Sequence, residues 1–278
     1  MQKGQIALGA GALILAAALY FGGKTTAKKE NVTTSVNTSS FSFETYEKNR
    51  KEALDVASRE KLAMLVSALK VPESDTAARK KGYVQLSEFW KEQQDPALAA
   101  YYVYQYAQVD HTKPAFENAG DALLSVYKSG SDSVISNNLI TFALRSYEEA
   151  VRIDGSDVEL KIKLADVYVQ GSQEPMKGIG ILRQLSDSLP DNIPVLLALG
   201  RLSIQSGQFD KAKERLQKVL KLAPQNTEAM YFLAIAEAQL GHTDEAIRMF
   251  EMCKQLVGNK DFDKEIDEIV KNLKSKKV

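Results

Sequence analysis

The pattern of apolar positions repeats itself between residues 192 and 258. Matching positions recur about thirty-four residues apart, and apolar side chains at helical spacing predict two helices in each period. Gly207 and Gly241 fall where the two helices of a period must turn, since glycine adopts left-handed conformations without steric cost. The matched pairs are Leu196 and Met230, Leu199 and Leu233, Gly200 and Ala234, Gly207 and Gly241, Ala212 and Ala246, Leu216 and Phe250, and Pro224 and Gly258.

The same pattern, less regular, extends upstream. Residues 80–111 form one full unit, a second opens at Phe116 and carries an insertion over 128–138, and a third covers 158–190. We therefore expect about five repeats over residues 79–260, more than the three or so that a stable array needs.

Single helices are expected on both sides of this array. Residues 43–70, within a segment 41–78, read as one long helix whose second half packs on the array through a stripe of leucines. Residues 261–273 read as an amphipathic capping helix, followed by a basic tail, within a segment 261–278. Tyr101, Tyr102 and Tyr104 provide more aromatic surface than one buried face requires, so we expect at least one to be exposed, with contact to a partner as an alternative to plain surface packing.

The period resembles the tetratricopeptide repeat family, whose signature runs aromatic, Leu-Gly, Tyr, Ala, aromatic and Pro at fixed offsets. This chain departs from that signature at the early aromatic position, which is Leu196 and then Met230. This resemblance implies an all-α fold, a right-handed superhelix of helix-turn-helix repeats, in which the first helices line a concave groove.

An uncharged, apolar stretch lies near the start of the chain. Residues 6–21 are apolar without interruption, and the uncharged run over 4–23 is just long enough, at about 1.5 Å per residue, to cross a bilayer. We expect 1–23 to be a retained membrane anchor; a cleaved signal peptide is the alternative. Residues 24–40 are polar and read as a flexible linker. The flanking lysines slightly favour a cytoplasmic body, but an apolar start usually exports the chain. The expected location is thus a bacterial inner membrane, crossed once, with a periplasmic soluble domain.

The charge balance and the few reactive side chains limit the classes of function to be expected. The chain has 36 basic and 36 acidic side chains, so its net charge gives no reason to expect nucleic acid as a partner. Its two histidines, His111 and His242, lie in different repeats, and its single cysteine, Cys253, falls where a small packing residue is expected. We expect no catalytic residue, metal site, cofactor or small-molecule substrate.

What remains is a surface that binds a protein or peptide. The resemblance places the groove at Glu117, Asp121, Ile162, Asp166, Leu197, Arg201, Ile204, Tyr231 and Ile235. An apolar channel with acidic residues near its middle suits a segment with apolar anchors and a basic residue. The alternative is that these apolar residues bury against the helix at 43–70 or against a second copy.

The leading interpretation is a non-catalytic, membrane-tethered scaffold that holds a partner in its groove. The alternative is a periplasmic holdase or assembly factor for unfolded clients, resembling anchored repeat proteins that act in apocytochrome maturation or beside a translocon. An enzyme would need polar groups converging in a closed cavity.

Overall fold

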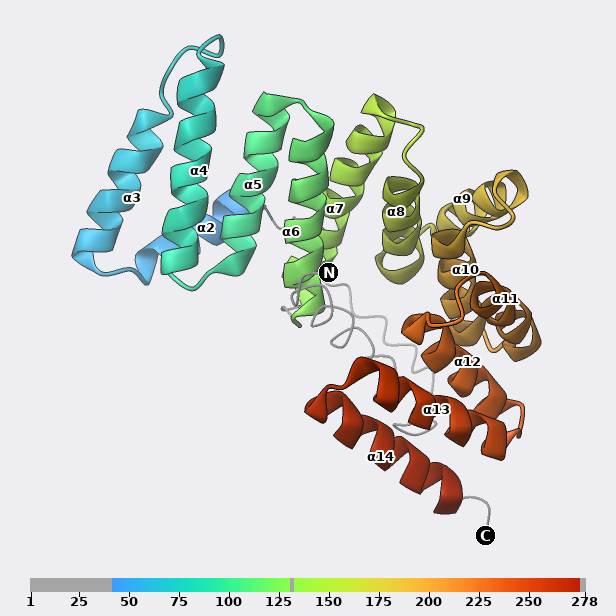
Figure 1. Ribbon diagram of the computed structural model, residues 1–278. Helices are drawn as coiled ribbons and strands as arrows, with labels where there is room; N and C mark the ends of the chain where they lie inside the picture. Colours follow the sequence, from blue (N-terminus) through green and yellow to red (C-terminus); the bar gives the residue numbers. More distant parts are fainter. Residues whose placement is uncertain (1–41, 131–132, 276–278) are drawn as a thin grey trace, which may run out of the picture. The chain divides into compact units, whose positions relative to one another are not determined.

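The computed structural model describes residues 42–130 and 133–275, and all regular secondary structure within these ranges is helical. The thirteen helices are α2 (Phe43–Glu52), α3 (Val56–Ala68), α4 (Thr76–Glu92), α5 (Pro96–Asp110), α6 (Lys113–Lys128), α7 (Ser133–Ile153), α8 (Val158–Gly171), α9 (Pro175–Ser188), α10 (Ile193–Gln205), α11 (Phe209–Leu222), α12 (Thr227–Gln239), α13 (Thr243–Val257) and α14 (Lys260–Ser275) (Figure 1). The predicted anchor and linker, residues 1–40, lie outside the described residues. Among the helices of residues 42–130 and 133–275, none combines the length with the apolar character that a membrane span needs.

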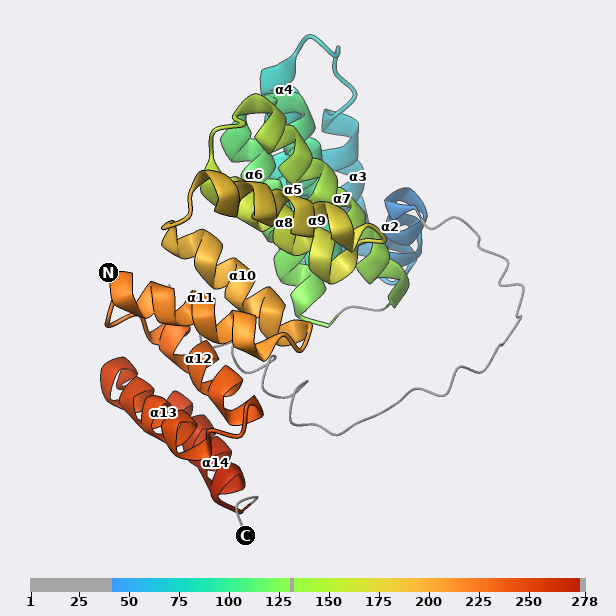
Figure 2. The same ribbon diagram turned by 90° about the vertical axis from the view of Figure 1, so that its right-hand side faces the viewer.

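The described helices fall into two compact units. The N-terminal unit holds α2 to α9 and ends at Pro190, and the C-terminal unit holds α10 to α14 and begins at Asp191. Consecutive helices pack as antiparallel pairs, α4 with α5, α6 with α7 and α8 with α9 in the first unit, and α10 with α11 and α12 with α13 in the second (Figures 1 and 2). The predicted all-α fold of consecutive helix pairs is confirmed.

The first helix of every pair begins at a capping side chain. Asp75, Thr112, Asp157, Asn192 and Asn226 each accept a hydrogen bond from the backbone N–H three residues further on. Such caps satisfy a donor that the first turn of a helix leaves open. Because the cap stands at the same place in each pair, the local sequence fixes where each repeat starts.

Several of the turns within the pairs use left-handed backbone. Gly207 and Gly241 have φ values of +70° and +86°, as their predicted role in the turn requires. Gln94 takes the same conformation between α4 and α5, with φ at 56°, although a side chain there costs about 1–2 kcal/mol.

The single long helix predicted for residues 43–70 is wrong. The chain leaves the helix after Glu52, and α3 begins anew at Val56, where the Asp55 side chain accepts a hydrogen bond from the Ser58 N–H. The predicted packing of the second half is found: Leu62 is buried, and Leu65 and Leu69 pack against the same core.

The insertion predicted over residues 128–138 is mostly helix. Lys128 ends α6 and Ser133 already starts α7, which runs for 21 residues. The extra residues therefore lengthen the second helix of this repeat rather than forming a long loop.

The exposure predicted for the tyrosines of α5 is wrong. Tyr101, Tyr102 and Tyr104 are 8%, 7% and 8% exposed. They are buried because α2 packs against α5, with the Phe43 ring stacked on Tyr101 at 4.5 Å between centroids.

The helix predicted to close the array is α14. It packs against α13 and buries one apolar face, while its charged residues lie on the other sides. The buried residues are Phe262, Ile266, Ile269, Val270 and Leu273.

Candidate partner-binding surfaces

The predicted groove residues of the N-terminal unit lie on α6 and α8. Glu117 and Asp121 face Lys163, whose Nζ lies 2.9 Å from one carboxylate and 3.0 Å from the other. Burial alone would lower the pKa of Lys163, but hydrogen bonds to these two carboxylates outweigh it and raise the pKa. One positive charge thus partly offsets the two carboxylates within the fold, and the sequence pattern did not point to Lys163.

A second contact holds Asp121. The Tyr147 hydroxyl on α7 donates a 2.5 Å hydrogen bond to Asp121, and burial, with this carboxylate, raises the pKa of Tyr147. On α8, Ile162 is buried and Asp166 is half-buried. Lys163 and Tyr147 are neighbours of Asp121 because of the way α6, α7 and α8 pack. The sequence does not specify this packing, so these contacts could not be predicted from it.

The predicted groove residues of the C-terminal unit are largely core. Leu197 and Ile204 on α10 and Tyr231 and Ile235 on α12 belong to one buried cluster. Arg201 is half-buried, and its Nη1 lies 2.9 Å from Glu228 Oε1. Contact of the nine residues with a partner stays a prediction; Glu117, Asp121, Asp166 and Arg201 are those that retain solvent exposure.

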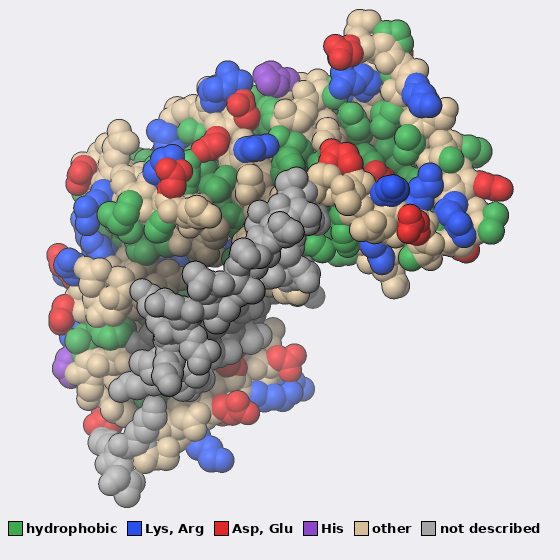
Figure 3. Space-filling model, turned by 180° about the vertical axis from the view of Figure 1, so that it is seen from behind, with side chains coloured by type: hydrophobic (Ala, Val, Ile, Leu, Met, Phe, Trp, Pro, Cys, Tyr) green, Lys and Arg blue, Asp and Glu red, His purple; other side chains and the backbone are tan. Residues whose placement is uncertain are grey.

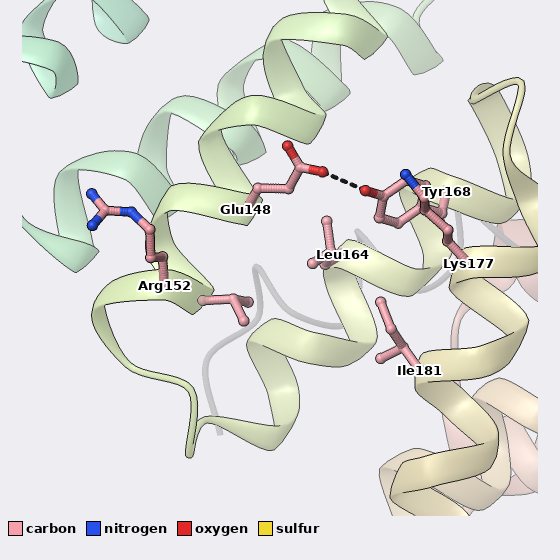
Figure 4. Close-up of a pocket in the computed structure, with 7 residues that line it drawn as sticks. Glu148, Arg152, Leu164, Tyr168, Lys177 and Ile181 are labelled. Carbon is pink, nitrogen blue, oxygen red and sulfur yellow. Dashed lines mark hydrogen bonds between the residues drawn. The ribbon is translucent and has the colours of Figure 1, made fainter.

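An open pocket of about 490 Å³ lies within the N-terminal unit (Figure 4). It is formed by α7, α8 and α9. Its lining residues are Glu148, Val151, Arg152, Leu164, Tyr168, Lys177 and Ile181.

The inside of the pocket is apolar and one end is polar. Leu164 and Ile181 point into the space between the helices (Figure 4). At the polar end, the Tyr168 hydroxyl donates to Glu148, and the Lys177 Nζ lies 5.6 Å from the centroid of the Tyr168 ring. Burial, reinforced by Glu148, raises the pKa of Tyr168, so the phenol stays a hydrogen-bond donor.

Close packing of α9 on α8 helps to shape this pocket. A Cβ at Gly178 would overlap the backbone carbonyl oxygen of Ala165, so only glycine lets the two helices approach this far. Ile181, on the same helix, forms part of the wall while Leu164 of α8 stands opposite it.

The pocket and the rest of the described chain offer little reactive chemistry. The lining holds no histidine, cysteine, serine or threonine. Across residues 42–130 and 133–275, no group of three or more His, Cys, Asp or Glu side chains is placed to hold a metal ion. Cys253 is buried, and burial raises the pKa of its thiol to about 12, which keeps it protonated. Acidic and basic side chains are interspersed over the face shown in Figure 3.

Residues 204–252 match the family model described as tetratricopeptide repeat. The matched stretch contains α11 and α12 and most of α13, the region where the repeated pattern is clearest. Repeats of this kind serve as scaffolds for protein–protein interaction, which is the functional class that the match supports.

Several solved structures are similar to this chain at low identity. The thermophilic repeat protein TTC0263 from Thermus thermophilus is 17% identical, with a TM-score of 0.48 over 68% of this chain and 97% of that one. PilW, a type IV pilus biogenesis factor, is 18% identical, with a TM-score of 0.48 over 65% and 78%. YrrB, a repeat protein with an unusual peptide-binding site, is 14% identical, with a TM-score of 0.43 over 73% and 97%. No protein with a curated description matches the chain.

Proposed function

We propose that this protein is a non-catalytic, membrane-tethered scaffold of tetratricopeptide repeats that holds a segment of a partner protein. The observation that carries the proposal is the open pocket formed by α7, α8 and α9, apolar inside and polar at one end.

The pocket has the size and chemistry for an apolar side chain of a bound segment. Its volume lies in the range of about 300–1,000 Å³ that is usual for ligand sites. Burying one Leu, Ile or Phe side chain there contributes about 1.5–3 kcal/mol. This is too little for stable capture, so the segment must make further contacts. The predicted ones are with Glu117, Asp121 and Asp166 of the same unit, of which Asp121 is exposed and the other two are half-buried.

The polar end sets the orientation of the segment. Lys177 is exposed and pairs with Glu174 one turn earlier, an interaction of small net energy. An acidic group beside the apolar anchor takes Lys177 as its partner at little cost. The pocket therefore fits a segment in which an aliphatic or aromatic residue stands next to an acidic one.

Crosslinking and pull-down from membranes test this proposal. The full chain is compared with Ile181→Glu, which places a charge in the wall of the pocket, and with Arg183→Glu, an exposed position on the same helix outside the lining. We expect Ile181→Glu to lose the partner and Arg183→Glu to keep it, with both variants folded by circular dichroism. Equal capture by all three chains would exclude the pocket as the binding site.

The same experiment separates the scaffold from a holdase. One dominant folded partner supports a scaffold, whereas many unrelated unfolded clients identify the holdase or assembly factor for apocytochrome or translocon clients. The variants Glu117→Gln and Asp166→Asn test the groove in the same assay. Weaker capture of the partner by these variants would indicate that it contacts the groove.

The tether and its location have their own test. A chain lacking residues up to Ser40 is expected to leave the membrane fraction, since the apolar run at 6–21 would be the anchor. A fusion to a reporter active only in the periplasm is expected to be active at the C-terminus. Activity of a cytoplasm-specific reporter instead would show that the orientation is the opposite of the proposed one.

A further inference from the structure

Helix α2 lies outside the helix pairs and against the aromatic side of α5. In Figure 1 it is seen behind α4 and α5, and in Figure 2 it stands at one side of the N-terminal unit. It has ten residues, of which only Phe43 is buried, at 2% exposure. Isolated helices shorter than about 12–15 residues are marginal in water, so the surface beneath α2 supports its helical form.

The surface receives Phe43 in an aromatic slot. The Phe43 ring stacks on Tyr101 of α5, with an interplanar angle of 10°, and meets Phe142 of α7 edge-on at 5.5 Å. Such aromatic pairs contribute beyond the area that they bury.

Beside the slot, the repeats supply three donors to acidic side chains of α2. The Tyr101 hydroxyl donates to Glu44 at 3.1 Å, and the Tyr102 hydroxyl and Trp90 Nε1 donate to Glu47 at 2.7 and 3.1 Å. Hydrogen bonds to a charged acceptor are stronger than neutral ones.

Towards the C-terminal end of α2, the hydrogen bonds run in the opposite direction, from α2 to an acceptor of the repeats. Asp95 of the repeats is 3% exposed and accepts hydrogen bonds from the Tyr46 hydroxyl at 3.1 Å and Arg50 Nε at 2.6 Å, both on α2. It also caps α5 through the Leu98 N–H, which holds its carboxylate in place.

The contacting residues of α2 follow one helical stripe. Phe43, Tyr46, Glu47 and Arg50 stand at the spacing by which a groove recognises the face of a bound helix. Thr45, Lys48 and Asn49 are exposed on the opposite side. Thus α2 is bound as a ligand would be, through one buried ring and polar contacts with complementary partners.

We propose that the surface formed by Trp90, Asp95, Tyr101, Tyr102 and Phe142 is a second docking site of this protein. Its occupant is a helical segment with an aromatic residue, Glu one and four positions later, and Arg seven positions later; α2 fills the site as an internal ligand. A partner segment of this chemistry displaces α2. This inference is independent of the pocket at α7 to α9.

A peptide of residues 42–53 tests the proposal in trans. The peptide carries a fluorescent label and is titrated against three chains. These are the full chain, a chain with Phe43→Ala and Glu47→Gln, and a control with Lys48→Gln and Asn49→Ala on the outer face of α2. Trp90, the single tryptophan of the chain, reports in the same samples because its Nε1 loses or regains the Glu47 partner.

The doubly substituted chain is expected to bind the peptide at least about tenfold more tightly than the full chain or the control does. In those two chains the tethered α2 competes with the peptide at high effective concentration. A peptide with Phe43→Ala should not bind. Absence of peptide binding by the doubly substituted chain would overturn the proposal. So would a loss of helical content beyond the ten residues of α2, because α2 would then be an integral part of the fold of the repeats.

Discussion

A methyl group on Gly178 would overlap the backbone carbonyl oxygen of Ala165, whereas one on Gly180, two residues further along α9, would meet nothing within 4 Å. Backbone cannot move aside as a flexible side chain can, so Gly178→Ala is expected to destabilise the protein by about 1–3 kcal/mol. Gly180→Ala is expected to stabilise it by up to about 1 kcal/mol through helix propensity. Urea unfolding of both variants measures the difference, and equal effects would contradict the close approach of α8 and α9.

Glu237 on α12 gives the stability a pH dependence. Its side chain is 3% exposed, with Lys213 Nζ at 3.0 Å and His242 Nδ1 at 2.6 Å. Burial alone would raise the pKa of Glu237, but the hydrogen bonds from His242 and Lys213 outweigh it and lower the pKa below 4.5.

Because the folded pKa is lower than the unfolded one, this contribution is complete above pH 4.5 and is lost as the pH falls through the folded pKa. Glu237→Gln should cost about 1–3 kcal/mol at neutral pH, with the deficit shrinking in acid. Thermal unfolding across the acidic range measures it, and the exposed Glu214→Gln is the control. A deficit that does not change with pH would show that the charge of Glu237 plays no part.

Lys163 is expected to couple energetically with the two acidic groove residues. Its ammonium group is partly exposed, so a double-mutant cycle of Lys163→Gln with Glu117→Gln should give about 0.5–1 kcal/mol. Lys161→Gln on the same helix, paired with Glu117→Gln, should give a coupling near zero. In the pull-down, Lys163→Gln should strengthen capture of a basic segment if the groove binds one. Unchanged capture of the partner by Lys163→Gln would show that the groove is not the binding site.

Tyr231 distinguishes a core residue from a groove residue. Its ring meets Phe250 and Phe262 at 5.5 and 6.1 Å, and its hydroxyl donates to Glu265 of α14. Tyr231→Ala should cost about 3–5 kcal/mol and loosen α14, whereas Tyr231→Phe should cost only about 0.5–1.5 kcal/mol. Far-UV circular dichroism during urea unfolding measures both. A stable Tyr231→Ala chain that fails to capture the partner would return Tyr231 to the groove.

The sequence alone predicted features that depend on neighbours along the chain. The helix pairs follow from apolar spacing, and the turns at Gly207 and Gly241 follow from the conformations open to glycine. The apolar face of α14 could be read in the same way. These features persist in the structure because each depends on residues within one or two helical turns.

The break between α2 and α3 shows the limit of that reasoning. Charged and apolar residues at helical spacing continue through residues 53–55, so periodicity gave no sign of an end there. The chain departs from the helix because α2 packs on α5 while α3 packs on α4.

The sequence by itself determined an all-α chain of helix pairs, because backbone propensity, caps and apolar periodicity are local. Only the tertiary structure decided which faces are available for binding. It buried Tyr101 and Tyr102 under α2, paired Glu117 and Asp121 with the single charge of Lys163, and opened a pocket at Leu164 and Ile181. The physical reason is that the exposure and charge of a side chain depend on neighbours distant in sequence, brought near only when the helices pack.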